Sequence, residues 1–112
     1  MILFKAEMVE LIRSGRKFQT RRFWKRPRVK VGSVHQVNTS YFVSSGLRIR
    51  ILRVWEQRVD HMSQDEAVAE GFPDWLSFMI YINKIIGKRD TLAEGRRCYA
   101  VEFALEGAKE TK

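Results

Sequence analysis

Three side chains with chemically useful spacing lie near the N-terminus: Lys17, Thr20 and Arg22. A threonine hydroxyl becomes a nucleophile when a base removes its proton, and a lysine whose pKa is lowered by burial can be that base. A nearby carboxylate can orient the amine or exchange protons with a leaving group. The arginine offers a rigid fork for a phosphate or a base edge. Nothing in this set requires a metal ion, and no metal or cofactor is expected.

These residues belong to a strongly basic segment. From Leu11 to Trp55 the chain has twelve Lys or Arg residues and no Asp or Glu. The rest of the chain has nine basic and thirteen acidic residues, a net charge of −4, so this segment accounts for the overall charge of +8. Such a division is typical of a protein that binds phosphates on one side. The alternative is a solvated basic face without a dedicated partner.

Aromatic residues are interleaved with these charges, and aromatic rings can stack on nucleic-acid bases. The predicted partner is therefore RNA or a nucleoside. The candidate binding residues are Arg21, Arg22, Phe23, Trp24, Lys25, Arg26 and Arg28.

Length and composition indicate the class of protein. The 112 residues are enough for one domain, which we place at residues 1–106, followed by a frayed tail at 107–112. The single cysteine, Cys98, excludes an internal disulfide and is expected to be a small buried residue. No signal peptide is recognisable, and the longest apolar stretch, WLSFMIYINKII, is too short to span a bilayer. We therefore expect a cytoplasmic protein with no membrane partner; its oligomeric state is not predicted.

The N-terminal half predicts one helix between strands. Residues 2–4 suggest a short strand, and residues 5–15 suggest a helix that ends at Gly15. Residues 31–43 predict a strand, the Ser-Ser-Gly at 44–46 a turn, and residues 47–55 a half-buried strand. The apolar alternation of this last strand slips at Leu52, which indicates a bulge.

The C-terminal half changes from period 2 to helical spacing. Ser63 and Glu66 form a capping box, so a short helix is expected to run to Glu70. Asp74 can cap a second helix, and Gly87 can close it. Its apolar stripe is Trp75, Phe78, Met79, Ile82, Ile85 and Ile86. After a loop, residues 96–106 predict a final strand. These elements predict an α+β fold, a small mixed or antiparallel sheet that can curl into a barrel, with flanking helices.

Several of these stretches together resemble one family. The pattern G-x-K-x-x-T-x-R, at Gly15, Lys17, Thr20 and Arg22, is similar to the signature of the ASCH domain, a relative of the PUA RNA-binding fold. The Val-Gly at 31–32, the block DEAVAEGFPDWLSFM and the terminal YAVEFAL resemble later parts of the same family. The resemblance covers almost the entire chain.

The resemblance implies a PUA-like barrel in which Lys17, Thr20, Arg22 and Glu70 converge in a cleft. One ASCH subgroup hydrolyses the acetyl amide of N4-acetylcytidine, and its Lys, Thr and Glu fall on Lys17, Thr20 and Glu70. By this resemblance Thr20 is a nucleophile or positions water, Lys17 is the base, and Glu70 donates a proton or orients the amine.

Other functions stay open. The chain differs from the compact hydrolases at Phe18, Gln19 and Arg21 and in the basic extension FWKRPRVK, which favours a substrate with several phosphates. A non-catalytic RNA-binding module is the main alternative function. Ribonuclease action lacks a credible histidine pair. In the purely structural alternative, Lys17 and Glu70 are only an ion pair and Thr20 caps a turn.

Overall fold

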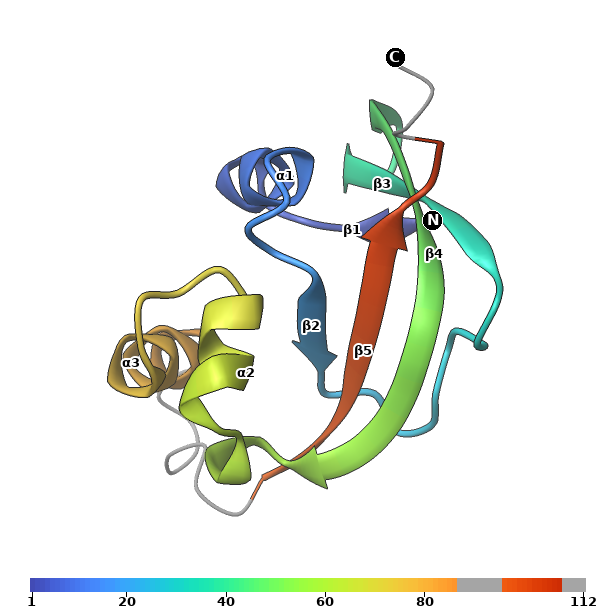
Figure 1. The fold of residues 1–112 in the computed structure, drawn as a ribbon. Coiled ribbons are helices and arrows are strands. Elements are labelled where there is room, and N and C mark those ends of the chain that lie inside the picture. The colour runs from blue at the N-terminus through green and yellow to red at the C-terminus, as the bar shows by residue number, and fades with distance from the viewer. Residues whose placement is uncertain (87–95, 108–112) are drawn as a thin grey trace.

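The computed structural model describes residues 1–86 and 96–107 (Figure 1). Along the chain these residues form β1 (Ile2–Leu3), α1 (Ala6–Arg13), β2 (Gln19–Arg22), β3 (Val34–Ser40), β4 (Val43–Arg58), a single 3₁₀ turn (Val59–His61), α2 (Gln64–Ala69), α3 (Trp75–Ile86) and β5 (Arg97–Leu105). Within these ranges, no helix is long and apolar enough to cross a membrane. The loop predicted after Gly87 and the tail beyond Gly107 lie outside the described residues.

The strands form one mixed sheet in the order β1-β3-β4-β5-β2. β1 runs parallel to β3, and the other neighbours are antiparallel. The long β4 and its partner β5 curve strongly, so the sheet is a half-barrel with the helices on its concave side (Figure 1). This arrangement confirms the predicted α+β class. It also leaves β2 at one edge of the sheet, facing α2.

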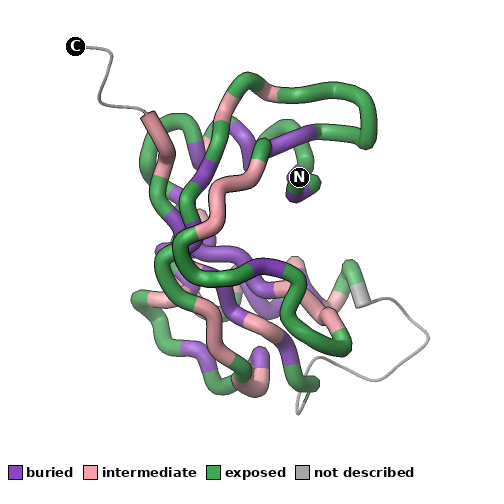
Figure 2. The backbone as a smooth tube through the Cα atoms, turned by 90° about the vertical axis from the view of Figure 1, so that its right-hand side faces the viewer, coloured by how far each residue is buried: buried purple, intermediate pink, exposed green. Residues whose placement is uncertain are grey.

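Two apolar clusters fill the concave side. The first lies under α1, whose Met8, Val9 and Ile12 pack against residues of β3, β4 and β5. The second joins α2 and α3 to the start of β5, where Cys98 is buried as predicted, and burial raises the pKa of its thiol to about 12. In Figure 2 the buried segments run through the middle of the trace, whereas the hairpin between β3 and β4 is exposed.

The structure confirms two features that were predicted from short sequence patterns, the capping box of α2 and the bulge in β4. The Ser63 hydroxyl accepts a hydrogen bond from the Glu66 amide at 3.1 Å, and the Glu66 carboxylate accepts one from the Ser63 amide at 2.7 Å, so the capping box of α2 is confirmed. The bulge at Leu52 is also confirmed. Ile51 pairs with Phe103 and Arg53 pairs with Glu102, so Leu52 is the extra residue.

The turn between β3 and β4 was predicted in the wrong place. It lies at residues 41–42, and the predicted turn residues Ser44, Ser45 and Gly46 belong to β4. They form a second irregularity, because Ser44 pairs with Asn38 while Leu47 pairs with Val37. The Ser45 hydroxyl donates to the Val37 carbonyl at 2.6 Å, which satisfies that carbonyl inside the sheet.

Two further features differ from the prediction. β2 was not predicted, because its sequence QTRR has no apolar alternation. In α3, Phe78, Met79 and Ile82 are buried and Trp75 is half-buried, but Ile85 is exposed. The side chain of Ile86 is outside the described part of the chain. Fewer residues of α3 are therefore buried in the core than the apolar stripe in its sequence predicted.

Candidate functional site

The backbone of Phe18 holds the end of α2 against the sheet. Its amide donates to the Ala69 carbonyl at 2.8 Å, and its carbonyl accepts from the Phe103 amide at 2.9 Å. The residues on either side of this contact, Lys17 and Gln19, therefore lie beside Glu70, which ends α2. Gly71 follows with φ +101°, and a Cβ there would come within 2.8 Å of Leu11, so the sharp exit from α2 requires glycine.

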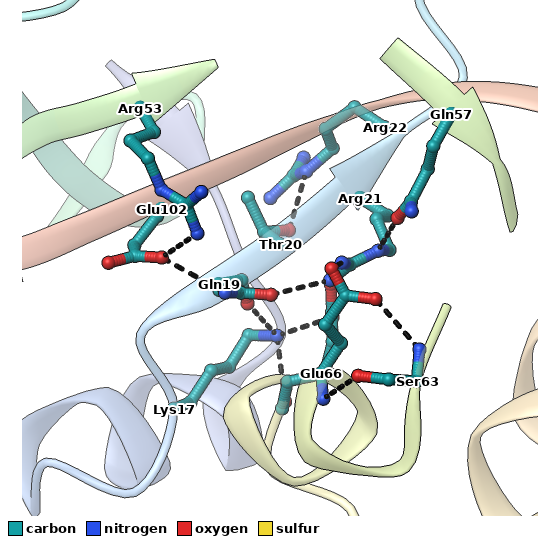
Figure 3. A network of polar contacts seen from close by, with 11 residues as sticks. Lys17, Gln19, Thr20, Arg21, Arg22, Arg53, Gln57, Ser63, Glu66 and Glu102 are labelled. Carbon is teal, nitrogen blue, oxygen red and sulfur yellow. Dashed lines mark hydrogen bonds and ion pairs between the residues drawn. The ribbon is translucent and has the colours of Figure 1, made fainter. Parts of the chain in front are cut away.

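The amine of Lys17 is enclosed by three acceptors. Its Nζ atom donates to the Gln19 carbonyl at 2.9 Å, the Glu70 carbonyl at 2.9 Å and the Glu70 Oε1 atom at 3.0 Å (Figure 3). Burial lowers the pKa of Lys17, because desolvation disfavours the charged form more than Glu70 favours it. The nearby charges of Arg22 and Arg21 also lower this pKa.

Arg21 holds the other side of the same carboxylate. Its Nη1 atom donates to Glu70 Oε2 and to the Gln19 side chain, both at 2.9 Å, and its Nε atom donates to the Gln57 side chain at 2.7 Å. Its Nη2 atom lies 3.2 Å from a Glu66 carboxylate oxygen, an ion pair without hydrogen-bond geometry. The Arg21 side chain is 0% exposed. Arg21 therefore lies inside the site and not on the surface predicted to bind RNA.

Thr20 and Arg22 lie on one face of β2, and Gln19 and Arg21 lie on the other, because side chains alternate along a strand. The Arg22 Nε atom donates to the Thr20 hydroxyl oxygen at 3.1 Å, and its Nη2 atom donates to the Leu3 carbonyl at 2.8 Å. The guanidinium lies 4.7 Å from the centre of the Phe4 ring. Burial lowers the pKa of Arg22, yet the group stays a cation at any ordinary pH.

A cavity of about 300 Å³ joins these groups, which is at the small end of the range for ligand sites. Its polar lining includes all four residues that the resemblance assigned to a cleft, Lys17, Thr20, Arg22 and Glu70. Its walls are largely apolar, and the rings that line it are Phe4, Phe23, Phe72, Phe78 and Tyr81. Aromatic walls with a few converging polar groups suit a flat heterocycle.

The remaining predicted binding residues lie in different environments. Phe23 lines the cavity, and Trp24 packs against the apolar cluster under α1. Lys25, Arg26 and Arg28 are exposed in the segment between β2 and β3. Their side chains form no ion pair or hydrogen bond with any residue that the structure describes.

The basic segment is partly neutralised in three dimensions. Besides Lys17 and Arg21, Arg50 pairs with Glu106 at 2.8 Å and Arg53 pairs with Glu102 at 2.7 Å. The acidic partners come from outside the segment, so charges that are separated along the sequence meet in the fold.

Sequence analysis missed several residues of the site. Gln19, Gln57 and Glu66 bind Arg21, and Lys5 and Tyr81 line the cavity. Lys5 lies two residues after the end of β1, and no motif marked it. In residues 1–86 and 96–107, no group of three His, Cys, Asp or Glu side chains is placed to hold a metal ion.

Comparison with solved structures shows the fold. No family model matches the sequence, and no curated protein matches it. The structure is similar to an ASCH domain from Lactobacillus crispatus, with a TM-score of 0.62 and 18% identity, over 88% of this chain and 70% of that one. It is also similar to a DUF984 protein from Enterococcus faecalis, with a TM-score of 0.65 and 18% identity, over 95% of this chain and 72% of that one. The curled mixed sheet with its flanking helices is thus similar in fold to a solved ASCH domain, as the sequence predicted.

Proposed function

We propose that the chain is an ASCH domain whose cavity binds N4-acetylcytidine and hydrolyses its acetyl amide. One observation carries this proposal: Lys17, Thr20 and Glu70 line a single cavity, with the Lys17 amine 3.0 Å from the Glu70 carboxylate. Thr20 and Lys17 line the same cavity, and a buried lysine is a group that can activate a threonine hydroxyl. The aromatic walls provide the stacking surfaces that a cytosine ring needs. RNA and its nucleosides occur in the cytoplasm, where we expect the protein to act.

In the proposed reaction, the Thr20 hydroxyl attacks the acetyl carbonyl carbon and its proton passes to the neutral Lys17 amine. The carbon–nitrogen bond then breaks. The departing cytosine amino group takes the proton from Lys17, and the acetyl group stays on Thr20 as an ester. Water cleaves this ester, which releases acetate and restores the hydroxyl. In the variant of this scheme without an ester, Thr20 positions the attacking water.

Glu70 fits the role of an orienting group better than that of a proton donor. Its two carboxylate oxygens accept from two cations, Lys17 at 3.0 Å and Arg21 at 2.9 Å, so the carboxylate is held in place from both sides. A carboxylate held in this way fixes the position of the Lys17 amine. Lys17 must give up one of its three hydrogen bonds to become a base, and its lowered pKa reduces the cost of that step.

Arg22 supports the nucleophile. Because its Nε atom donates to the Thr20 oxygen at 3.1 Å, a positive charge lies beside the atom that becomes anionic. That contact stabilises negative charge on the oxygen as its proton leaves. The same contact leaves the Thr20 hydroxyl hydrogen free to point toward a base.

A non-catalytic RNA-binding module is the second candidate function. The observation in its favour is the complete set of acceptors around Lys17, because an ammonium with three partners has no need of a further role. The exposed cations Lys25, Arg26 and Arg28 would bind the RNA backbone in that case. Ribonuclease action has less support, because neither His35 nor His61 lines the cavity.

The test is incubation of the protein with N4-acetylcytidine, free and within a short RNA, followed by detection of cytidine and acetate. Lys17→Met should abolish turnover while the protein stays folded by circular dichroism. Arg16→Met is the matched control, because Arg16 is the adjacent cation but is exposed and does not line this cavity. No turnover of either substrate by folded wild-type protein would overturn the hydrolase proposal, and RNA binding without turnover would support the binding module.

A further inference from the structure

The lining of the cavity carries more positive than negative charge. Lys5, Lys17, Arg21 and Arg22 line it, and Glu70 is the one carboxylate among its lining residues in the described part of the chain. Glu70 binds Lys17 and Arg21. The charges of Lys5 and Arg22 therefore remain without a carboxylate partner.

Lys5 lies at the wall of the cavity, where its amine has a cation–π contact but no acidic partner within residues 1–86 and 96–107. Its Nζ atom is 5.5 Å from the centre of the Tyr81 ring, which also lines the cavity. Across the described ranges, the amine forms no ion pair and no hydrogen bond. Lys5 precedes the first residue of α1, and its side chain does not cap the helix. Lys5 is exposed, so its amine is accessible to a ligand that enters the cavity.

Arg22 reaches the same stretch of chain from β2. Its Nη2 atom binds the Leu3 carbonyl at 2.8 Å, and its guanidinium lies over Phe4, the residue before Lys5. Nε binds Thr20, whereas Nη1 has no hydrogen-bond partner among the described residues. The chain thus brings two unpaired cations, Lys5 and Arg22, to residues 3–5 at one side of the cavity.

A neutral nucleoside offers these two cations no negative charge, whereas a phosphate does. Lysine and arginine form strong, charge-assisted hydrogen bonds to phosphate oxygens. The aromatic walls and the two cations together match a flat base attached to a phosphorylated sugar.

We infer that the cavity accepts a pyrimidine nucleotide in preference to a free nucleoside, with the base between the aromatic walls and a phosphate at Lys5 and Arg22. The identity of the base rests on the proposed function, but the phosphate preference rests only on these two cations. The phosphate can belong to a free mononucleotide or to an RNA strand.

The first test compares kcat/KM for N4-acetylcytidine, its 5′- and 3′-monophosphates, and a trinucleotide with the modified base in the middle. One monophosphate should be hydrolysed about tenfold faster than the nucleoside, or more, because charge-assisted contacts favour the phosphorylated form. A trinucleotide that exceeds both monophosphates identifies RNA as the source of the phosphate, and the reverse identifies a free nucleotide. Equal rates for nucleoside and all phosphorylated forms would overturn the inference while leaving the hydrolase proposal intact.

Lys5→Met locates the phosphate. In this variant the ratio of kcat/KM for the phosphorylated substrates to that for the nucleoside should fall most of the way to one. Lys30→Met removes the same charge from an exposed position outside the cavity and should change neither rate. A phosphate advantage that survives in both Lys5→Met and Lys5→Gln would contradict the assigned site.

A binding measurement separates this inference from the proposed reaction. If no substrate is hydrolysed, the affinities of cytidine and its monophosphates are compared by calorimetry in wild-type protein, Lys5→Met and Lys30→Met. Tighter binding of a monophosphate that depends on Lys5 would support the inference although the hydrolase proposal had failed. Equal, Lys5-independent affinities would overturn it.

Discussion

The Nζ atom of Lys17 lies 3.0 Å from the Oε1 atom of Glu70, and each side chain is only 4% exposed. The two residues are 53 positions apart in the sequence. Their contact closes β2 onto the end of α2, and Arg21 holds the second oxygen of the same carboxylate at 2.9 Å. One buried carboxylate therefore serves two buried cations. The stability of this region and the chemistry of the cavity depend on the same group.

Removing the charge of Glu70 should destabilise the fold as well as the site. Glu70→Gln leaves Lys17 and Arg21 buried without a carboxylate between them, and breaking a buried ion pair from one side costs about 3–5 kcal/mol. Urea unfolding followed by tryptophan fluorescence measures this loss. Glu56→Gln is the control, because its partner Arg97 is exposed and should contribute little. Equal losses in the two variants would mean that burial does not set the strength of the Glu70 contacts.

The pH dependence of hydrolysis should follow the pKa of Lys17. Only the neutral amine accepts a proton, so kcat/KM should rise with pH and level off above this pKa, with an inflection below the ordinary value of 10.5. The positive charge of Arg22 contributes to the lowering, so Arg22→Gln should move the inflection to higher pH. Arg16→Gln should leave it in place. Rates corrected for alkaline hydrolysis without protein provide the measurement, and a flat profile would exclude Lys17 as the base.

The Thr20 hydroxyl is predicted to be essential and its methyl group dispensable. Thr20→Ser keeps the hydroxyl and should retain measurable kcat, whereas Thr20→Val has a similar shape and should have none. Thr39→Val makes the same change at an exposed position and should behave as wild type. Steady-state kinetics on N4-acetylcytidine distinguishes the three. Full activity in Thr20→Val would rule out both the nucleophile and the water-positioning role of Thr20.

The elements that sequence predicted well have their determinants close together in the chain. The capping box of α2 depends on two residues three positions apart, and the bulge at Leu52 is visible as a slip in the alternation of one strand. The resemblance named Lys17, Thr20, Arg22 and Glu70, and all four line one cavity. Their catalytic roles remain proposals.

The features that the sequence could not predict depend on contacts between residues that are far apart in the chain. The polar strand QTRR reads as a surface loop, because only the contacts of Arg21 to Gln57, Glu66 and Glu70 explain why it is buried. The acid-free segment from Leu11 to Trp55 appeared to be one positive surface for the same reason. Glutamates from outside it neutralise several of its cations. Lys5 was missed because the Tyr81 ring beside it lies on α3, far along the chain.

The core stripe of α3 gives a prediction about stability that is independent of function. Phe78 is 1% exposed and contacts Phe72 with ring centres 5.3 Å apart, so Phe78→Ala should cost about 3–5 kcal/mol of unfolding free energy. Leu76 lies on the same helix but is 61% exposed, and Leu76→Ala should change the free energy by about 0.5 kcal/mol or less. Chemical unfolding of both variants provides the comparison. An unchanged stability in Phe78→Ala would contradict the described packing of α3.

The exposed cations between β2 and β3 should control the salt dependence of RNA binding. Each phosphate neutralised on a single strand contributes about 0.7 to the slope of log K against log salt. Replacing Lys25, Arg26 and Arg28 together by serine should therefore make that slope shallower by about 2. The control replaces three other arginines by serine and so removes the same charge. These arginines, Arg50, Arg53 and Arg97, are already paired with Glu106, Glu102 and Glu56. The slope of this control variant should change less, because each of these arginines must break its ion pair with a glutamate before it can bind a phosphate. Equal changes in both triple variants, measured by fluorescence anisotropy with a labelled RNA, would mean that binding follows net charge and not the segment between β2 and β3.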